Sequence, residues 1–499
     1  MASNMQTVGK KIQGSTSDRI SHLPANVIDK ILTCMPVRDA VRTSILSRKW
    51  RYAWVTLPEL VFDDRFCFGL GRPPAYNLLM VVYQVLLLHR GPILKLKLCL
   101  PIIPGSPEID QLLLFVSNNG IEELVLNIGG DELYKLPSSI FSCEQLKHLE
   151  LIFCLFKPPP SFKGFRKLLS LDLRSVDISF EVFSSLISSC PLLEKLKLVD
   201  CPSINDLEIS APKLKCLFFE GEFISSICFK NSPNLARVSL YCRESMTCET
   251  SKWDSFFADL PVVEFLELGD GCLESIFAGG VPRRLPSVLS HMKILKLYLD
   301  LDEVPSMLCL VRSSPNLKKI EIWLPPTSHE IEYEESLEGP LDLQGWADIS
   351  LNQLKEVELR DGCCTRFELE LVKLVLAKSP ILEKMVIVLD DLIHGLESKF
   401  LEEVKGLKPL SPLAKVSSNT LPGVIMPPKT RHILAASKGK AIAKSFNVSK
   451  RSRVEPPPYQ TYLTANVEER AKVIATWTLY REREVDQVSI ATTDIPEMI

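Results

Sequence analysis

One short pattern, apolar-x-x-apolar-x-apolar, recurs twelve times between residues 93 and 387 and constrains the fold more than any other feature. Examples are LKHLEL from Leu146, LEKLKL from Leu193 and LKEVEL from Leu354. The last two apolar positions alternate with polar ones, as a β-strand with one buried face requires. Successive copies begin 21 to 37 residues apart, so each predicts one strand in an array of similar units.

A proline marks the approach to many of these strands. It lies two residues before the pattern in six copies, as Pro191, Pro212, Pro233, Pro261, Pro315 and Pro380. Amphipathic segments precede several copies, at residues 181–190, 307–314 and 367–379. Since proline ends a helix and holds the residue before it in an extended conformation, each unit is expected to run helix, proline, strand. The sequence therefore predicts an α/β fold, an irregular leucine-rich-repeat solenoid with parallel strands on one side and helices on the other.

The repeated leucines themselves are interpreted as core packing. Any binding is expected at the polar positions between them and in the loops that leave the strands. Such surfaces usually bind proteins, although the fold alone does not establish this.

The composition indicates a folded chain of several parts. The 499 residues are 46% hydrophobic and 24% charged, with a net charge of −3 that gives no general attraction to nucleic acid or membranes. No secretory signal is recognised, and the longest apolar run, residues 78–88, is about half of the roughly 20 residues that span a bilayer. A buried helix is expected there, an intracellular location in the nucleus or cytoplasm, and no membrane partner.

No cofactor or metal site is expected from the sequence. The fifteen cysteines form no C-x-x-C and no zinc spacing, so free thiols are predicted. No G-x-S-x-G, phosphate-binding glycine loop or H-E-x-x-H occurs, and the seven histidines are scattered. The chain is therefore expected to be non-catalytic.

The first sixty residues predict three short helices. Pro24 suits the first turn of a helix whose apolar stripe ends at Pro36. Asp39 is a plausible N-cap for a second helix, and Ser47 could begin a third that carries Trp50 and Trp54. So small a core is expected to close against a partner or the following domain.

The stretch ISHLPANVIDKILTCMPVRDAVRTSILSRKWRYAW, residues 20–54, resembles an F-box. The resemblance implies docking onto a Skp-type adaptor that connects to a cullin and the ubiquitin-conjugating machinery. The two tryptophans are expected to lock the third helix rather than contact the adaptor. Matching positions imply eleven adaptor contacts: Leu23, Pro24, Ile28, Ile31, Leu32, Met35, Pro36, Val37, Ser44, Leu46 and Ser47.

Residues 354–390 resemble the FBD segment of plant F-box/leucine-rich-repeat proteins, with LEEVKGLKPLSPL from Leu401 approximating its serine-proline close. Such a segment could cap the solenoid. The expected organisation is a flexible N-terminus (1–16), an F-box (17–62), the solenoid (63–350), the FBD segment (351–413) and a basic linker with a helical tail (414–499), partly disordered.

The tail does not match this family. Residues 408–454 contain ten Lys or Arg and no Asp or Glu, and Lys450, Arg451 and Arg453 could form a nuclear-localisation or nucleic-acid patch. Two functions are therefore expected. The first is substrate recognition in a Skp–cullin–F-box ubiquitin ligase, with a protein substrate on the repeats. The alternative is a non-degradative scaffold that reaches nucleic acid or the nucleus through the tail.

Overall fold

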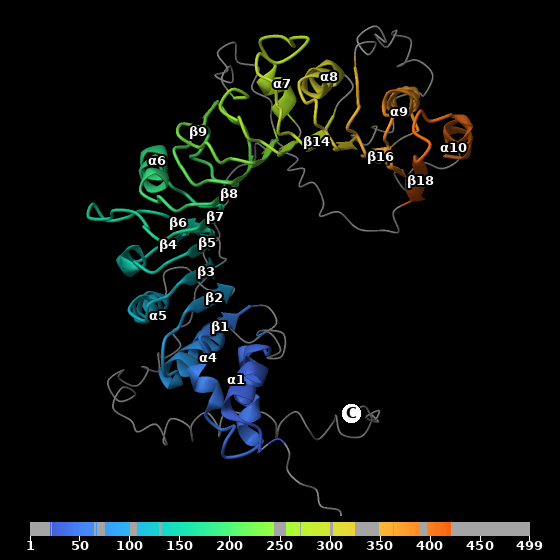
Figure 1. Cartoon of the computed structure of the whole chain (residues 1–499). Coiled ribbons are helices and arrows are strands. Elements are labelled where there is room, and N and C mark those ends of the chain that lie inside the picture. The colour runs from blue at the N-terminus through green and yellow to red at the C-terminus, as the bar shows by residue number, and fades with distance from the viewer. Residues whose placement is uncertain are drawn as a thin grey trace, which may run out of the picture.

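Figure 1 shows the computed structural model, in which a helical N-terminal region leads into a curved sheet with helices on its outer side. The structure describes residues 20–420 except 21, 64–65, 67–74, 100–106, 129–131, 244–255, 270, 300–302, 325–348, 363 and 390–396. The predicted patch at Lys450, Arg451 and Arg453 lies outside the described residues.

Fourteen parallel strands form one continuous sheet, as the repeated pattern predicts. The first half consists of β1 (Glu59–Phe62), β2 (Lys95–Cys99), β3 (Glu123–Asn127), β5 (His148–Ile152), β7 (Ser170–Arg174), β8 (Lys195–Val199) and β10 (Cys216–Gly221). The second half consists of β12 (Arg237–Cys242), β13 (Phe265–Leu268), β14 (Ile294–Tyr298), β15 (Lys319–Trp323), β16 (Glu356–Gly362), β17 (Lys384–Leu389) and β18 (Lys415–Thr420).

Each of the twelve predicted strands begins two residues after the start of its copy of the pattern, as His148 does after Leu146. The first residue of every copy is buried, with Leu317 the most exposed at 3%. The side chains that alternate with the leucines lie on the other face of the strands, which we call the inner face because it lines the inside of the arc (Figure 1).

The sheet extends one strand further at each end than the sequence analysis predicts. Strand β1 lies within the expected F-box, and Leu57, two residues before it, fits the pattern together with Leu60 and Phe62 of the strand. Strand β18 begins at Lys415, two residues after the end expected for the FBD segment, and pairs with β17. The FBD segment thus continues the solenoid sheet.

The register of the strands is set at their first residues. The carbonyl oxygen of Glu122 accepts hydrogen bonds from the N–H groups of both Lys147 and His148, at 2.7 and 3.0 Å. The same double acceptance recurs from strand to strand, for instance from Lys215 and Cys216 to Glu194. Equivalent residues of successive copies therefore face each other across the sheet.

Helices cover the outer side where the connection is long enough (Figure 1). They are α4 (Ala75–Leu88), α5 (Pro107–Ser117), α6 (Phe180–Ser188), α7 (Cys272–Ile276), α8 (Val304–Arg312), α9 (Arg366–Lys378) and α10 (Glu397–Gly406), with the 3₁₀ helix η3 (Ser138–Ser142). The helices predicted at 181–190, 307–314 and 367–379 are confirmed, and the apolar run from Leu78 lies in α4 with Val82 fully buried. None of the described helices has the length and apolar character needed to cross a bilayer.

Two pairs of short strands replace helices elsewhere on the outer side: β4 (Tyr134–Lys135) with β6 (Cys154–Leu155), and β9 (Asp206–Glu208) with β11 (Ser226–Cys228). The copies around β9 and β11 begin only 21 residues apart, at Leu193, Leu214 and Leu235. This spacing leaves too few residues for a helix between strands, so helix-proline-strand is not the rule in every unit.

The N-terminal region consists of α1 (Ala25–Thr33), α2 (Val37–Arg42) and the 3₁₀ helices η1 (Thr43–Ile45) and η2 (Ala53–Thr56). Pro36, not Asp39, precedes α2 as its N-cap residue. The helix predicted from Ser47 forms turns followed by η2, because most of its backbone hydrogen bonds connect residues three apart, as from Ala53 to Trp50. One hydrophobic core runs from this region through the whole sheet.

Candidate functional site

Several large apolar side chains of the N-terminal region are exposed, although the same region has a buried hydrophobic core. Ile45 is 86% exposed and Leu46 49%, while Val27 and Ile31 lie one turn apart on α1 at 36% and 37%. Exposed apolar side chains in one small region are typical of a surface that binds another protein. We call Val27, Ile31, Ile45 and Leu46 the N-terminal apolar surface.

The predicted adaptor contacts divide into exposed and buried residues. Pro24, Ile31, Pro36 and Leu46 are exposed, and Leu23, Met35, Ser44 and Ser47 are partly buried. Ile28, Leu32 and Val37 belong to the core instead, at 2%, 0% and 3% exposure, and are not available to an adaptor in this conformation. Sequence reasoning did not select Val27 and Ile45, whose only signal is their place beside the F-box-like positions.

Two of the partly buried predicted contacts have an unusual polar environment. The hydroxyl oxygens of Ser44 and Ser47 are buried and have no hydrogen-bond partner among the described residues. A buried hydroxyl without a partner lowers the stability of the fold. Both serines follow α2 closely and flank the exposed pair Ile45 and Leu46.

The two tryptophans stabilise the N-terminal region from inside. Trp50 and Trp54 are each 3% exposed, and Nε1 of Trp50 donates a hydrogen bond to the carbonyl oxygen of Ile20 at 3.1 Å. Both tryptophans therefore pack in the core, although the segment that carries them forms turns and η2 instead of the predicted third helix. Their burial fixes the path of the chain from α2 to β1, and so the position of the exposed residues before it.

Four aromatic side chains form a row on the inner face of the solenoid, which we call the aromatic ladder: Phe218, Tyr241, Tyr298 and Trp323. Ring centroids of neighbouring members lie 5.3 to 5.5 Å apart, and Tyr298 stacks on Trp323 at an interplanar angle of 14°. The guanidinium of Arg360 lies 4.9 Å from the Trp323 ring centroid and extends the row to β16. Aromatic and arginine side chains of this kind contribute most of the binding energy in many protein interfaces.

The ladder is continuous because one strand contributes no side chain to it. Gly269 follows β13, which lies between the strands of Tyr241 and Tyr298. The Tyr241 ring occupies the space beside Gly269 and thereby reaches Tyr298 two strands away. None of these residues was predicted from the sequence as part of a site.

The buried carboxylate of Glu267 holds Tyr241 of the ladder in place. Glu267 on β13 is 7% exposed, accepts a hydrogen bond from Ser239 Oγ at 2.8 Å and forms an ion pair with Lys296 at 2.7 Å. Burial by itself would raise the pKa of Glu267, but the hydrogen bonds from Lys296, Tyr241 and Ser239 outweigh it and hold the pKa below its usual value. Burial and the bond to Glu267 raise the pKa of Tyr241, so its hydroxyl remains a donor.

Lys296 and Arg360 also belong to a wider charge network on β14 to β16. Glu321 lies 3.7 Å from Lys296 and 3.4 Å from Arg360, while Glu358 pairs with Lys319 at 3.4 Å. The cations beside Tyr298 and Trp323 are therefore neutralised by carboxylates of the same chain. This part of the inner face offers aromatic surface with little net charge.

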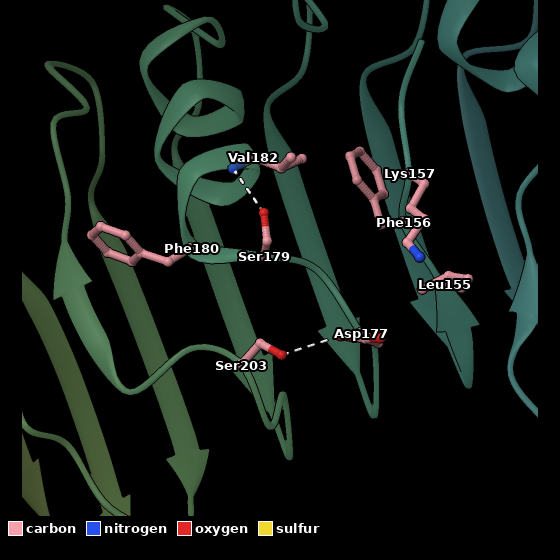
Figure 2. Close-up of a pocket in the computed structure, with 8 residues that line it drawn as sticks. All are labelled: Leu155, Phe156, Lys157, Asp177, Ser179, Phe180, Val182 and Ser203. Carbon is pink, nitrogen blue, oxygen red and sulfur yellow. Dashed lines mark hydrogen bonds between the residues drawn. The ribbon is translucent and has the colours of Figure 1, made fainter. Parts of the chain in front are cut away.

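A pocket lies between β6 and the start of α6, and Figure 2 shows the residues that line it. Its volume is about 460 Å³. Its polar groups mostly serve the fold: Ser203 Oγ donates to Asp177 Oδ1 at 3.1 Å, and the Val182 N–H donates to Ser179 Oγ at the start of α6. The remaining wall is largely apolar, and no motif from the sequence analysis points to it. Within the described residues no group of three His, Cys, Asp or Glu side chains is placed to hold a metal ion.

Comparison with known proteins gives two family matches. Residues 20–62 match the F-box domain, and residues 109–322 match the family described as FBD-associated F-box protein At5g56370, LRR repeats. The F-box/FBD/LRR-repeat protein At1g13570 of Arabidopsis thaliana is 40% identical over 387 residues, which cover 75% of this chain and 92% of that protein. The Arabidopsis thaliana F-box/FBD/LRR-repeat protein At4g26340 is 28% identical over 308 residues, 58% of this chain and 67% of that protein.

Proposed function

Because the chain belongs to the F-box/FBD/LRR-repeat family, we propose that it is the substrate-recognition subunit of a Skp–cullin–F-box type ubiquitin ligase. The observation that carries the proposal is the N-terminal apolar surface, whose Ile45 is 86% exposed beside the well-packed core of the same region. A Skp-type adaptor would cover this surface, and through it the chain would reach a cullin.

The adaptor contacts that we propose are the exposed and partly buried members of the predicted set, together with Val27 and Ile45. Ile28, Leu32 and Val37 would support them from the core. Ser44 and Ser47 would gain hydrogen-bond partners when the adaptor binds, because their hydroxyl oxygens have none among the described residues.

In this proposal the inner face of the solenoid receives a protein substrate. The chain performs no bond chemistry itself. It raises the effective concentration of substrate lysines near the conjugating enzyme by holding both in one complex.

Capture by a purified plant Skp-type adaptor tests the proposal, with full-length chain and an Ile45→Asp/Leu46→Asp variant. Both side chains are exposed, so the variant is expected to keep its circular dichroism spectrum and unfolding temperature while capture falls at least tenfold. The matched control is Leu114→Asp on α5, where the side chain is 51% exposed on the outer side of the solenoid. The control should be captured like the unmodified chain.

The Leu32→Ala variant tests whether Leu32 supports the core or contacts the adaptor. Leu32 is fully buried, so its truncation should cost about 2 to 5 kcal/mol of stability and reduce capture only by unfolding the region. Equal capture of the unmodified chain and the folded Ile45/Leu46 variant would refute the proposed docking surface. Failure of a well-folded unmodified chain to bind the adaptor would refute the proposed function.

A further inference from the structure

We infer that the middle of the inner face binds an acidic, apolar, extended segment of a partner protein through three cations, Lys195, Lys197 and Arg237, which we call the basic strip. The inference rests on the proposed function, in which this face receives the substrate. It adds the chemical class of the segment that is recognised.

The basic strip lies on β8 and β12, on either side of β10. Among the described residues none of its three members forms an ion pair with a carboxylate, in contrast to Lys296, Lys319 and Arg360 further along the same face. Glu194 and Glu264 interact electrostatically with Lys195 and Arg237, but each of these carboxylates forms its closest ion pair with another lysine, so the strip keeps an excess of positive charge.

The carboxylates that border the strip are already engaged. Glu194 pairs with Lys215 at 2.8 Å and Glu264 with Lys293 at 2.6 Å. Asp172, which faces Lys197 across the sheet, pairs with Arg174 at 2.7 Å. Of the neighbouring acids described, Glu220 forms no ion pair, but it occupies the far end of β10 from Cys216, which faces Lys195 and Arg237.

Apolar surface is interleaved with the charges. Lys197 Nζ lies 4.6 Å from the centroid of the Phe218 ring, and the Arg237 guanidinium lies 4.2 Å from that of Phe265. Cys216 lies between Lys195 and Arg237 in the register, and Ile294 follows Phe265. A ligand that fits must therefore present carboxylates and apolar side chains together.

The span of the surface gives the size of the segment. From β8 to β14 there are four inter-strand steps of about 4.8 Å, or about 19 Å, which an extended chain at about 3.3 Å per residue crosses in about six residues. A nucleic acid fits less well, because three cations can neutralise only a few of its closely spaced phosphates, and phosphates make no apolar contact with Phe218 and Phe265.

The test uses full-length chain and a fluorescein-labelled peptide of about ten residues in which Asp or Glu alternate with Phe or Leu, with binding measured by fluorescence anisotropy. A Lys197→Glu/Arg237→Glu variant should bind this peptide at least tenfold more weakly. The matched control, Lys384→Glu/Lys415→Glu, reverses two cations at the first positions of β17 and β18 and should bind within twofold of the unmodified chain. A peptide with Asn and Gln in place of Asp and Glu should bind weakly. Binding of the acidic peptide should weaken in about 0.5 M salt, because salt screens the charges.

Three outcomes would overturn the inference. The first is the absence of peptide binding by the unmodified chain up to about 1 mM, a binding free energy of roughly −4 kcal/mol. The second is equal loss of binding in both double variants. The third is tighter binding of a labelled single-stranded oligonucleotide than of the peptide, with the same dependence on Lys197 and Arg237.

Adaptor capture of the same proteins separates this inference from the proposed function. The peptide assay needs no adaptor, and the strip variants leave the N-terminal apolar surface unchanged. Capture without peptide binding would overturn the basic strip alone, whereas peptide binding without capture would overturn the ligase assignment alone.

Discussion

The ring of Tyr241 occupies the position that a side chain at residue 269 would need: a Cβ atom added to Gly269 would lie 2.3 Å from Cδ1 of Tyr241. Tyr241 on β12 and Gly269, which directly follows β13, thus share one space, and this shared space joins the two halves of the aromatic ladder. The contact involves the base of the ring rather than its tip, so a small rotation of the side chain does not relieve it.

Gly269→Ala is expected to displace Tyr241 and destabilise the solenoid by about 1 to 3 kcal/mol, as overpacking in a tight site does. Urea denaturation followed by circular dichroism measures the change. The control is Gly279→Ala, where an added Cβ meets no atom within 4 Å and the effect should stay within about 0.5 kcal/mol. In a Tyr241→Ala background the cost of Gly269→Ala should largely disappear, and simple additivity of the two changes would contradict the shared space.

Trp50→Phe should cost about 1 to 2 kcal/mol, because it removes the hydrogen bond to the Ile20 carbonyl while keeping an aromatic ring in the core. Trp50→Ala should cost about 3 to 5 kcal/mol. Tyr52→Ala is the control, since Tyr52 is 42% exposed, and should change stability little. Urea titrations monitored by far-ultraviolet circular dichroism give all three values. Similar stability of the Trp50→Ala and Tyr52→Ala chains would argue against the role of Trp50 as an anchor.

Glu267→Gln should lower stability near neutral pH by about 1 to 3 kcal/mol, because Lys296 loses its closest carboxylate in a buried setting. The folded-state pKa of Glu267 is held below its usual value of 4.5, so the unfolded chain takes up the proton first on acidification. The stabilisation is thus present above about pH 4.5 and is lost as the pH falls through the folded-state pKa.

Urea denaturation at several values between pH 7 and pH 3.5 tests this dependence. The difference between the unmodified chain and Glu267→Gln should narrow toward acid pH. Glu383→Gln, in the exposed pair with Lys355, supplies a control whose effect should be small throughout. A difference that stays constant with pH would show that the charge of Glu267 does not carry the stabilisation.

Chains ending at residue 413 and at residue 420 should behave differently. The shorter chain lacks β18 and leaves the edge of β17 unpaired, although Met385, Ile387 and Leu389 of that strand are buried. We expect it to unfold at lower temperature and to associate on size-exclusion chromatography, as sheets with long unprotected edges do. The longer chain should unfold like the full-length protein. Identical behaviour of the two truncated chains would show that β18 is dispensable.

The solenoid could be predicted because its pattern reports burial directly. Every copy places apolar residues at the positions that must face the core, so strand starts such as His148 and Lys195 follow from the sequence. Strand β18 was not predicted, because Ser418 occupies the position where the pattern requires its last apolar residue.

The N-terminal apolar surface was predicted only in part, because the buried core and the exposed apolar positions use the same residue types. Leu32 and Ile31 are neighbours in one apolar stripe, yet one is fully buried and the other 37% exposed. Which side of the helix is covered depends on the packing of Trp50 and Trp54, and periodicity cannot decide it.

The sequence does contain a signal for the aromatic ladder. Tyr241, Gly269, Tyr298 and Trp323 are each the sixth residue after the start of their copy of the pattern. An alignment of the copies by this pattern would have placed three rings and one glycine in a single column. The ring contacts across Gly269 depend on side-chain directions, which the column alone does not give.

The paired hydrogen bonds at each strand start have a consequence for how recognition can change. Since the same main-chain bonds and the same buried positions recur at every strand, connections of different length lead to equivalent inner-face positions, and each strand supplies its own short set of side chains. Where side chains of neighbouring strands do not share space, as Tyr241 does with Gly269, a substitution at one inner-face position alters the surface of its own strand and leaves the N-terminal region unchanged. Binding specificity can therefore change through substitutions at inner-face positions of single strands, while the buried residues stay the same.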